Sequence, residues 1–251
     1  MIGGKKQPVH STEKPRPGAD RPLPREFAGV GSLPHPFAGA RFLTTAAEWR
    51  QLPDGEAPEI AFAGRSNAGK SSAINALAGR TRLAFVSKTP GRTQHINFFE
   101  LRSGALLADL PGYGYAAVPE AMRRRWQSFL SRYLSTRVPL AGLVLVMDCR
   151  RPMTPLDRQM LDWFLPSGRP VRILLAKADK LNVRERALAL ARTRDALAAD
   201  YSVDPMRLDV QLFSAEHRIG IAEAEAAIIA WLAPRPRVPE GQKERPRHQG
   251  E

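Results

Sequence analysis

Residues 64–71 combine glycines, a lysine and a serine at the spacing of a phosphate-binding loop, G-x-x-x-x-G-K-S. The two glycines allow the backbone to turn so that successive N–H groups point at phosphate oxygens. Lys70 would reach the outer phosphates, and the Ser71 hydroxyl would ligate Mg²⁺. The nucleotide contacts predicted in this segment are Gly64, Arg65, Ser66, Asn67, Ala68, Gly69, Lys70 and Ser71.

A D-x-x-G pattern ends a later predicted strand and consists of Asp109, Leu110, Pro111 and Gly112. The Asp109 carboxylate would hold Mg²⁺ through water, and the Gly112 N–H would meet the γ-phosphate and so respond to hydrolysis. Between the two patterns, the hydroxyl of Thr89 or of Thr93 could supply a further ligand to Mg²⁺. Their positions alone do not choose between these threonines.

Two segments near the C-terminus predict which base is bound, namely Ala176-Lys177-Ala178-Asp179 and Phe213-Ser214-Ala215. The first resembles the N-K-x-D motif of GTPases. Its Asp179 carboxylate would accept hydrogen bonds from guanine N1–H and the 2-amino group, which adenine cannot offer. Lys177 would lie over the ring and brace the phosphate loop, and a backbone N–H of the second segment would meet the guanine carbonyl. Because Ala176 replaces the usual asparagine, we expect weaker affinity with unchanged specificity.

The elements that must position these residues alternate between apolar runs and helical patterns. Strands are expected at 59–64, 95–102, 105–109, 141–148, 171–176 and 208–213, and helices at 70–78, 119–135, 155–165, 183–199 and 220–232. The pair 95–102 and 105–109 is joined too tightly for a crossover and predicts an antiparallel hairpin. The sequence therefore predicts an α/β, Ras-like domain over residues 39–233, with a six-stranded, mostly parallel sheet and helices on both faces.

Composition limits the class of protein and suggests a partner. The 251 residues include 38 basic and 25 acidic side chains, a formal net charge of +13 that favours association with RNA. Coding bias in a GC-rich genome is an alternative source of the many arginines. Residues 1–38 and 234–251 are rich in Pro and Arg and predict flexible arms. The single cysteine, Cys149, and the lack of an apolar stretch long enough for a membrane span favour a cytoplasmic protein.

Together, the segments G-R-S-N-A-G-K-S-S, T-P-G-R-T-Q, D-L-P-G-Y-G-Y and K-A-D resemble the EngB family of bacterial GTPases. The resemblance covers about residues 40–233. It implies that Thr93 is the switch threonine on Mg²⁺. It also implies that the nucleotide is lined by Gly91, Arg92, Thr93, Gln94 and His95. The role it implies is GTP-dependent maturation of the large ribosomal subunit, through contact with its precursor particle or rRNA. Normal septum formation would then depend on ribosome supply.

The resemblance and the residues together predict a mechanism that uses Asn67, Lys70, Thr93 and Gly112. Ras-type enzymes orient the attacking water with a glutamine after D-x-x-G, but Tyr113 holds that place here, so we expect slow intrinsic hydrolysis. Asn67 suggests that a potassium ion beside the phosphates stimulates it. The alternative is that Asn67 only caps the loop. For Arg65 and Arg92, contact with solvent or a partner is favoured over a catalytic role.

The predicted helix 119–135 carries three consecutive arginines, Arg123, Arg124 and Arg125, directly after the second switch. They predict either an RNA-binding surface or an ordinary solvated face. Trp126, Phe129, Leu130, Tyr133 and Leu134 follow at helical spacing and predict core packing. We expect His95 and Cys149 to have structural side chains.

Two other functions compete with the GTPase switch. One is an RNA- or ribosome-binding module with a nearly inactive phosphate loop, which the retained Lys70, Ser71 and Asp109 disfavour. The other is a P-loop kinase or ATPase, which the K-A-D segment disfavours. A monomer is expected, because no oligomerisation stripe is evident.

Overall fold

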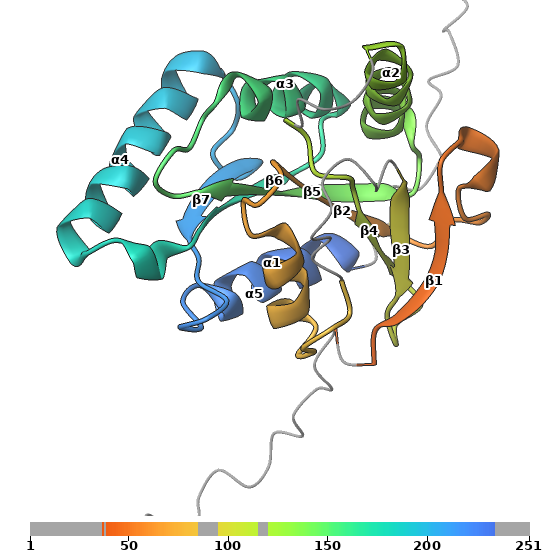
Figure 1. Ribbon diagram of the computed structural model, residues 1–251, viewed down its shortest axis with the longest axis horizontal. Coiled ribbons are helices and arrows are strands. Elements are labelled where there is room, and N and C mark those ends of the chain that lie inside the picture. The colour runs from red at the N-terminus through yellow and green to blue at the C-terminus, as the bar shows by residue number, and fades with distance from the viewer. Residues whose placement is uncertain (1–36, 38, 85–94, 115–119, 234–251) are drawn as a thin grey trace, which may run out of the picture. The chain divides into compact units, whose positions relative to one another are not determined.

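The computed structural model describes Phe37, residues 39–84, residues 95–114 and residues 120–233, except for the Arg123 side chain (Figure 1). The strands are β1 (Arg41–Ala46), β2 (Glu59–Gly64), β3 (Ile96–Glu100), β4 (Leu106–Asp109), β5 (Leu140–Asp148), β6 (Val171–Ala176) and β7 (Leu208–Leu212). The helices are α1 (Lys70–Leu77), α2 (Glu120–Thr136), α3 (Pro155–Phe164), α4 (Val183–Asp200) and α5 (Ile221–Leu232). Short 3₁₀ turns are η1 (Trp49–Gln51), η2 (Leu165–Ser167) and η3 (Ala178–Lys180).

The strands form one sheet in the order β1-β3-β4-β2-β5-β6-β7. β2 lies between β4 and β5 and is parallel to both, whereas β3 is antiparallel to β1 and β4. The α/β class, the parallel centre and the β3–β4 hairpin confirm the prediction. The expected count of six strands was wrong, because β1 adds a seventh at the edge.

The sequence did not reveal β1 for a physical reason. Its burial runs from exposed at Arg41 to buried at Ala46 without alternation. A register irregularity between Phe42 and Thr44 interrupts its pairing with β3. An edge strand with a bulge lacks the period-two pattern that marks a half-buried strand.

Helices cover both faces of the sheet (Figure 1). On one face α2, α3 and α4 pack over side chains that include Leu143, Leu145 and Met147 of β5. On the other face α1 and α5 pack over the alternate residues of the same strand, Val144 and Val146. This alternation explains why β5 reads as a continuous apolar run, since a parallel strand buried on both faces has no polar side.

One residue of the segment expected to be an N-terminal arm is buried. Phe37 is fully buried in the cluster that contains α1 and α5, although it lies within the segment expected to be an arm. The other residues of 1–38 and all of 234–251 lie outside the described residues. None of the described helices is long and apolar enough to cross a bilayer.

A buried network of hydrogen-bonded side chains lies at the start of β2. Glu59, expected to begin a mostly apolar strand, is fully buried. It accepts a hydrogen bond from the Tyr133 hydroxyl at 2.8 Å and from Arg137 Nε at 3.0 Å. Burial, together with the nearby Glu59 carboxylate, raises the pKa of Tyr133 well above its usual value, so the phenol stays protonated. The network ties α2 to the central strand.

Candidate functional site

The phosphate loop connects the central strand β2 to α1, and glycine is required at both ends of it. A Cβ on Gly64 would lie 2.7 Å from the Val146 carbonyl oxygen of β5, which leaves no room for a side chain. Gly69 has a φ of +111°, a conformation that glycine adopts at little cost. α1 begins directly after it at Lys70, so the positive end of this helix faces the loop.

The D-x-x-G segment lies directly against this loop. The Ser66 N–H donates to the Tyr113 carbonyl at 2.9 Å. A Cβ on Gly112 would come within 3.2 Å of the Ser66 Cα and N atoms. The two segments that would sense the γ-phosphate therefore touch through their backbones, and glycine permits the close approach.

Lys70 and Asp109 form an ion pair at the ends of α1 and β4. The exposed fractions of their side chains are 10% and 9%, so both charges lie largely out of water. Ser71 is the second residue of α1. A hydroxyl, a carboxylate and the oxygens of a nucleotide are the ligands that Mg²⁺ prefers, so the side-chain types of Ser71 and Asp109 fit this ion.

The base-recognition segment is joined to the phosphate loop by a lysine. Lys177, which has a left-handed φ of 61°, donates from Nζ to the Asn67 carbonyl at 2.5 Å and to Asp148 at 3.0 Å. Burial tends to raise the pKa of Asp148, but hydrogen bonds from Arg150 and Lys177 outweigh it and hold this pKa well below its usual range. Asp148 is therefore an anion that fixes Lys177 in place.

Asp179, the residue expected to recognise the base, has a buried side chain that two neighbours hold. Its side chain is 4% exposed and pairs with Lys180 at 2.9 Å, and the Ser214 hydroxyl donates to its Oδ1 at 2.6 Å. Burial tends to raise the pKa of Asp179, but these two hydrogen bonds lower it overall, so the group is ionised at neutral pH. An ionised carboxylate is an acceptor only, as recognition of the two guanine donors requires.

Of the predicted segment Phe213-Ser214-Ala215, the Ser214 N–H already has a partner within the protein, because it donates to the Ile219 carbonyl at 3.0 Å. Ala176, which stands where asparagine is usual, has an exposed fraction of 3%. The Ala178 N–H donates to the Phe213 carbonyl at 3.0 Å and the Cys149 N–H to the Ala176 carbonyl at 2.9 Å. Backbone hydrogen bonds therefore join the loops around Ala176.

Tyr113 does not face the phosphate loop with its phenol. It is 7% exposed, and its hydroxyl donates at 2.8 Å to Asp157, a fully buried residue of α3. Burial, followed by the Asp157 charge, raises the pKa of Tyr113 well above its usual value. Arg65 is held on the same carboxylate at 3.8 Å and also donates to the Arg151 carbonyl. Both side chains are thus engaged by the protein.

Some predicted contacts lie outside the described residues: Thr89, Gly91, Arg92, Thr93 and Gln94. His95 is described and half-buried. Its Nδ1 has no hydrogen-bond partner in the part of the chain that the structure describes. Leu110 and Pro111 are buried beside Gly112.

Asp148 and Asp157 are site residues that sequence reasoning missed. Asp157 belongs to a capping box with Thr154 at the start of α3, and its T-P-x-D spacing could have marked the helix start. Nothing in the sequence indicates its bond to Tyr113. Asp148 ends an apolar run, and only the β5–β6 pairing brings it to Lys177.

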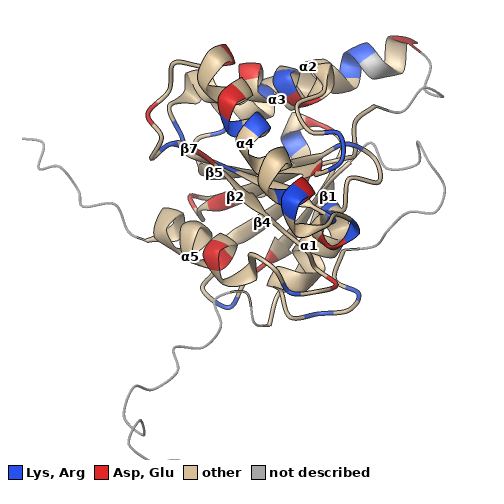
Figure 2. Cartoon of the chain, turned by 90° about the vertical axis from the view of Figure 1, so that its left-hand side faces the viewer, with Lys and Arg blue, Asp and Glu red and all other residues tan. Residues whose placement is uncertain are grey.

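The arginines of α2 whose side chains the structure describes, Arg124, Arg125 and Arg132, are exposed. Arg124 pairs with Glu120 at 3.6 Å and Arg125 with Glu48 at 2.7 Å, and basic positions recur along α2 (Figure 2). The apolar side chains of this helix, predicted to pack in the core, differ in how far they are buried. Leu130, Tyr133 and Leu134 are fully buried, as predicted. The expectation for Trp126 and Phe129 was partly wrong, because both are only half-buried and pack at the border of the core.

Known proteins match both the sequence and this arrangement. Residues 59–177 match the model of a family described as 50S ribosome-binding GTPase. A protein of Aromatoleum aromaticum named "Probable GTP-binding protein EngB" is 59% identical over 196 residues, which are 78% of this chain and 89% of that protein. One of the same name from Thiobacillus denitrificans is 58% identical over 195 residues, 78% of this chain and 92% of that protein.

Solved structures share the fold. The crystal structure of a GTP-binding protein engB is 24% identical and superposes with a TM-score of 0.53 over 70% of this chain and 100% of its own. A GTP-binding protein of Sulfolobus solfataricus in complex with GDP gives a TM-score of 0.51 at 20% identity, over 70% of this chain and 52% of its own. The phosphate loop and the adjoining D-x-x-G segment agree with these matches. Because relatives that it matches over most of their length are 59% and 58% identical, the chain belongs to the EngB family of GTP-binding proteins.

Proposed function

We propose that this protein is a slow GTP-hydrolysing switch that acts in assembly of the large ribosomal subunit. The observation that carries the GTP part is the Lys177 bridge, since it joins the segment containing ionised Asp179 to the carbonyl of Asn67 in the phosphate loop. Lys177 would thus link base recognition to phosphate binding. The ribosomal part is supported by the formal charge of +13 and by the description of the matching family.

Phosphate binding exchanges one ion pair for another. Lys70 is held by Asp109, and the outer phosphates of GTP would compete with this carboxylate for the ammonium group. Ser71 and Asp109, with Thr93 by family resemblance, would hold Mg²⁺. When bound, the ion neutralises charge on the β- and γ-phosphate oxygens. Because the backbones of Gly112 and Ser66 lie in contact, loss of the γ-phosphate would change the conformation of both loops.

Slow hydrolysis follows from the orientation of Tyr113. Its phenol is bonded to Asp157 inside the protein, so it is not placed to orient the attacking water, and it lacks the amide that Ras-type enzymes use. We propose that a potassium ion held by Asn67 supplies the missing charge. Asn67 has a left-handed φ of 63°, which asparagine tolerates better than most residues. This backbone preference alone could explain the residue, so the side chain must be tested separately.

Asn67→Gly separates the two explanations. Glycine retains the left-handed backbone and the carbonyl that accepts from Lys177, but removes the amide. If the amide holds potassium, the variant binds GTP normally and its turnover is the same in potassium and in sodium buffer. Retained potassium stimulation in Asn67→Gly would refute this role.

The function itself is tested by measuring turnover of GTP and ATP, with and without potassium and purified large ribosomal subunits. The expected result is GTP-specific turnover that rises with subunits. A second candidate is an RNA- or ribosome-binding module with a nearly inactive site, favoured by the internal bonding of both Tyr113 and Arg65. Binding to subunits without any turnover would select it.

The remaining parts of the proposal follow from the ribosomal role. The protein would be cytoplasmic, associated with precursor particles of the large subunit and monomeric. Its requirement in septation would be indirect, through ribosome supply. A depletion experiment in which subunit assembly fails before septa are lost would support this order, and the reverse order would contradict it.

A further inference from the structure

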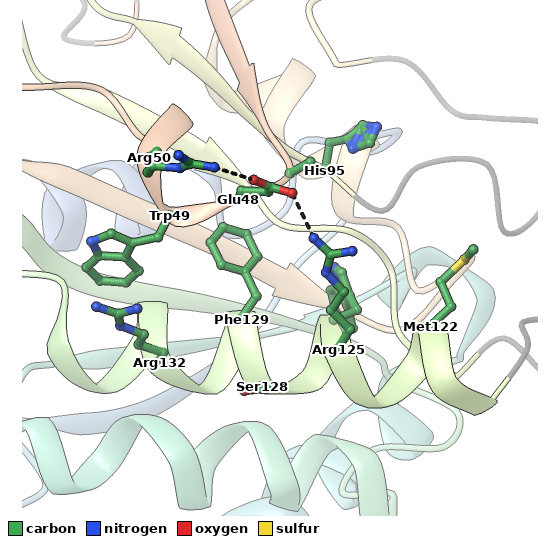
Figure 3. Close-up of a pocket in the computed structure, with 11 residues that line it drawn as sticks. Glu48, Trp49, Arg50, His95, Met122, Arg125, Ser128, Phe129 and Arg132 are labelled. Carbon is green, nitrogen blue, oxygen red and sulfur yellow. Dashed lines mark hydrogen bonds and ion pairs between the residues drawn. The ribbon is translucent and has the colours of Figure 1, made fainter.

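A pocket lies between the η1 turn and α2, and its lining includes His95, one of the expected nucleotide contacts (Figure 3). We call it the η1–α2 pocket and define it by Glu48, Trp49, Arg50, Arg125, Phe129 and Arg132. Its volume of about 530 Å³ is within the range of sites that hold a small molecule or a single nucleotide.

Positive charge is fixed at two places in this pocket. Glu48 holds Arg125 at 2.7 Å and Arg50 at 3.7 Å, so one carboxylate orients two guanidinium groups and leaves a net positive charge. The side chains of Arg50 and Arg125 are 90% and 77% exposed, and both can reach a ligand in solution. Their exposed guanidinium groups add positive charge to this side of the pocket.

The third arginine is arranged differently. The guanidinium carbon of Arg132 lies 4.0 Å from the centre of the Trp49 ring, and Figure 3 shows the two groups facing each other. Among the described residues Arg132 has no acidic partner. A guanidinium on an indole ring offers a flat cationic surface on which an unpaired base can stack.

The combination of an aromatic ring with arginines favours single-stranded RNA over an acidic peptide or duplex RNA as the ligand. An acidic peptide would use the charges but not the Arg132–Trp49 surface, and duplex RNA hides its bases within the helix. A single RNA strand alternates phosphates with exposed bases and uses both features. We propose that the η1–α2 pocket binds an unpaired nucleotide of single-stranded RNA, with the base on Arg132 and a flanking phosphate on the exposed guanidinium of Arg125. This deepens the proposed ribosomal function, and its RNA part can be tested without ribosomes.

The test compares two arginine-to-glutamine variants of the full chain. Arg132→Gln removes the stacking surface, and Arg192→Gln on α4 is the control, since it removes the same charge from an exposed site near the opposite edge of the sheet. The probe is a single-stranded 12-nucleotide RNA containing 2-aminopurine, whose fluorescence falls when the base stacks. Loss of one stacked base is expected to weaken binding by about 5-fold or more in Arg132→Gln and to abolish most of the quenching. Arg192→Gln should stay within about 2-fold of the unmodified chain.

Salt dependence distinguishes stacking from phosphate binding. Arg125→Gln should lower the slope of log affinity against log salt by about 0.7, the value for one phosphate on a single strand, and leave the quenching largely intact. Melting temperature and GTP affinity of each variant report whether the fold is retained. Equal losses in Arg132→Gln and Arg192→Gln, or equal competition by polyglutamate or by duplex RNA, would overturn the proposal.

Cosedimentation with large ribosomal subunits separates this inference from the proposed function. If the oligonucleotide binds through Arg132 but the chain does not sediment with subunits, the pocket stands and the ribosomal role fails. If the chain sediments with subunits equally in both variants and the oligonucleotide result is also equal, the ribosomal role stands and the pocket assignment fails.

Discussion

Replacing Tyr113 by Phe should destabilise the protein without slowing GTP hydrolysis. The substitution removes only the hydroxyl that donates to Asp157 Oδ1 at 2.8 Å. The other oxygen, Oδ2, accepts from the Thr154 N–H and hydroxyl and faces Arg65. Within the described residues Oδ1 would therefore lose its donor while the carboxylate stays fully buried.

The magnitude follows from this geometry. Leaving a buried charged acceptor unsatisfied costs about 1.5–3 kcal/mol, and the ring itself still fills its space, so no cavity term is added. For a domain of this size the loss corresponds to a fall in Tm of about 3–12 °C. Tyr201→Phe is the matched control, because its hydroxyl donates at 3.1 Å to the exposed Asp162. It should cost less than about 0.5 kcal/mol.

Urea or thermal unfolding gives the stability change, and single-turnover GTP hydrolysis gives the rate. A double-mutant cycle with Asp157→Asn should show coupling of about 0.5–3 kcal/mol between the two side chains. A Tyr113→Phe variant of normal stability whose hydrolysis rate falls by about 100-fold would refute the reasoning, since a loss of that size indicates proton transfer or water orientation by the phenol.

Three further outcomes are expected. Glu59→Gln should cost about 3–5 kcal/mol of unfolding free energy, measured by urea unfolding, because Arg137 would lose the charge that compensates it in the interior. Gly112→Ala should weaken GTP binding by about 5- to 150-fold in a fluorescent-nucleotide titration. The reason is that the new Cβ would lie 3.2 Å from Ser66 backbone atoms, and overpacking of this kind costs about 1–3 kcal/mol. Cys149 should resist iodoacetamide at pH 8, with labelling that accelerates as pH rises, because burial raises the pKa of its thiol to about 11; rapid labelling of the native chain would contradict this.

The sequence predicted the parts of this molecule whose signal is local. Strand β2, the phosphate loop and α1 follow one another without a break, and the predicted strand 59–64 coincides with the observed one. The bounds of α2 and α4 were predicted within one residue at each end. Long periodic segments and glycine-rich turns carry their own physical constraints, so they can be read without knowing their neighbours.

What the sequence did not predict depends on contacts between distant residues. β1 pairs with β3 more than 50 positions later along the chain, as in the register of Arg41 with Glu100. The bond of Tyr113 to Asp157 spans 44 positions. A single sequence shows that each residue is polar or aromatic, but it does not show which partner satisfies it once buried.

The order of the strands has a consequence for synthesis of the chain. β2 is made early but needs β5 as a parallel neighbour, so the centre of the sheet cannot close until Asp148 has left the ribosome. The Ser214 hydroxyl that holds Asp179, and the Ile219 carbonyl that fixes Ser214, are made later still. A nascent chain that ends before Ser214 would therefore carry the phosphate loop without the bond that orients its base-recognising carboxylate. If Asp179 recognises guanine as proposed, this discrimination is among the last properties that the emerging polypeptide acquires.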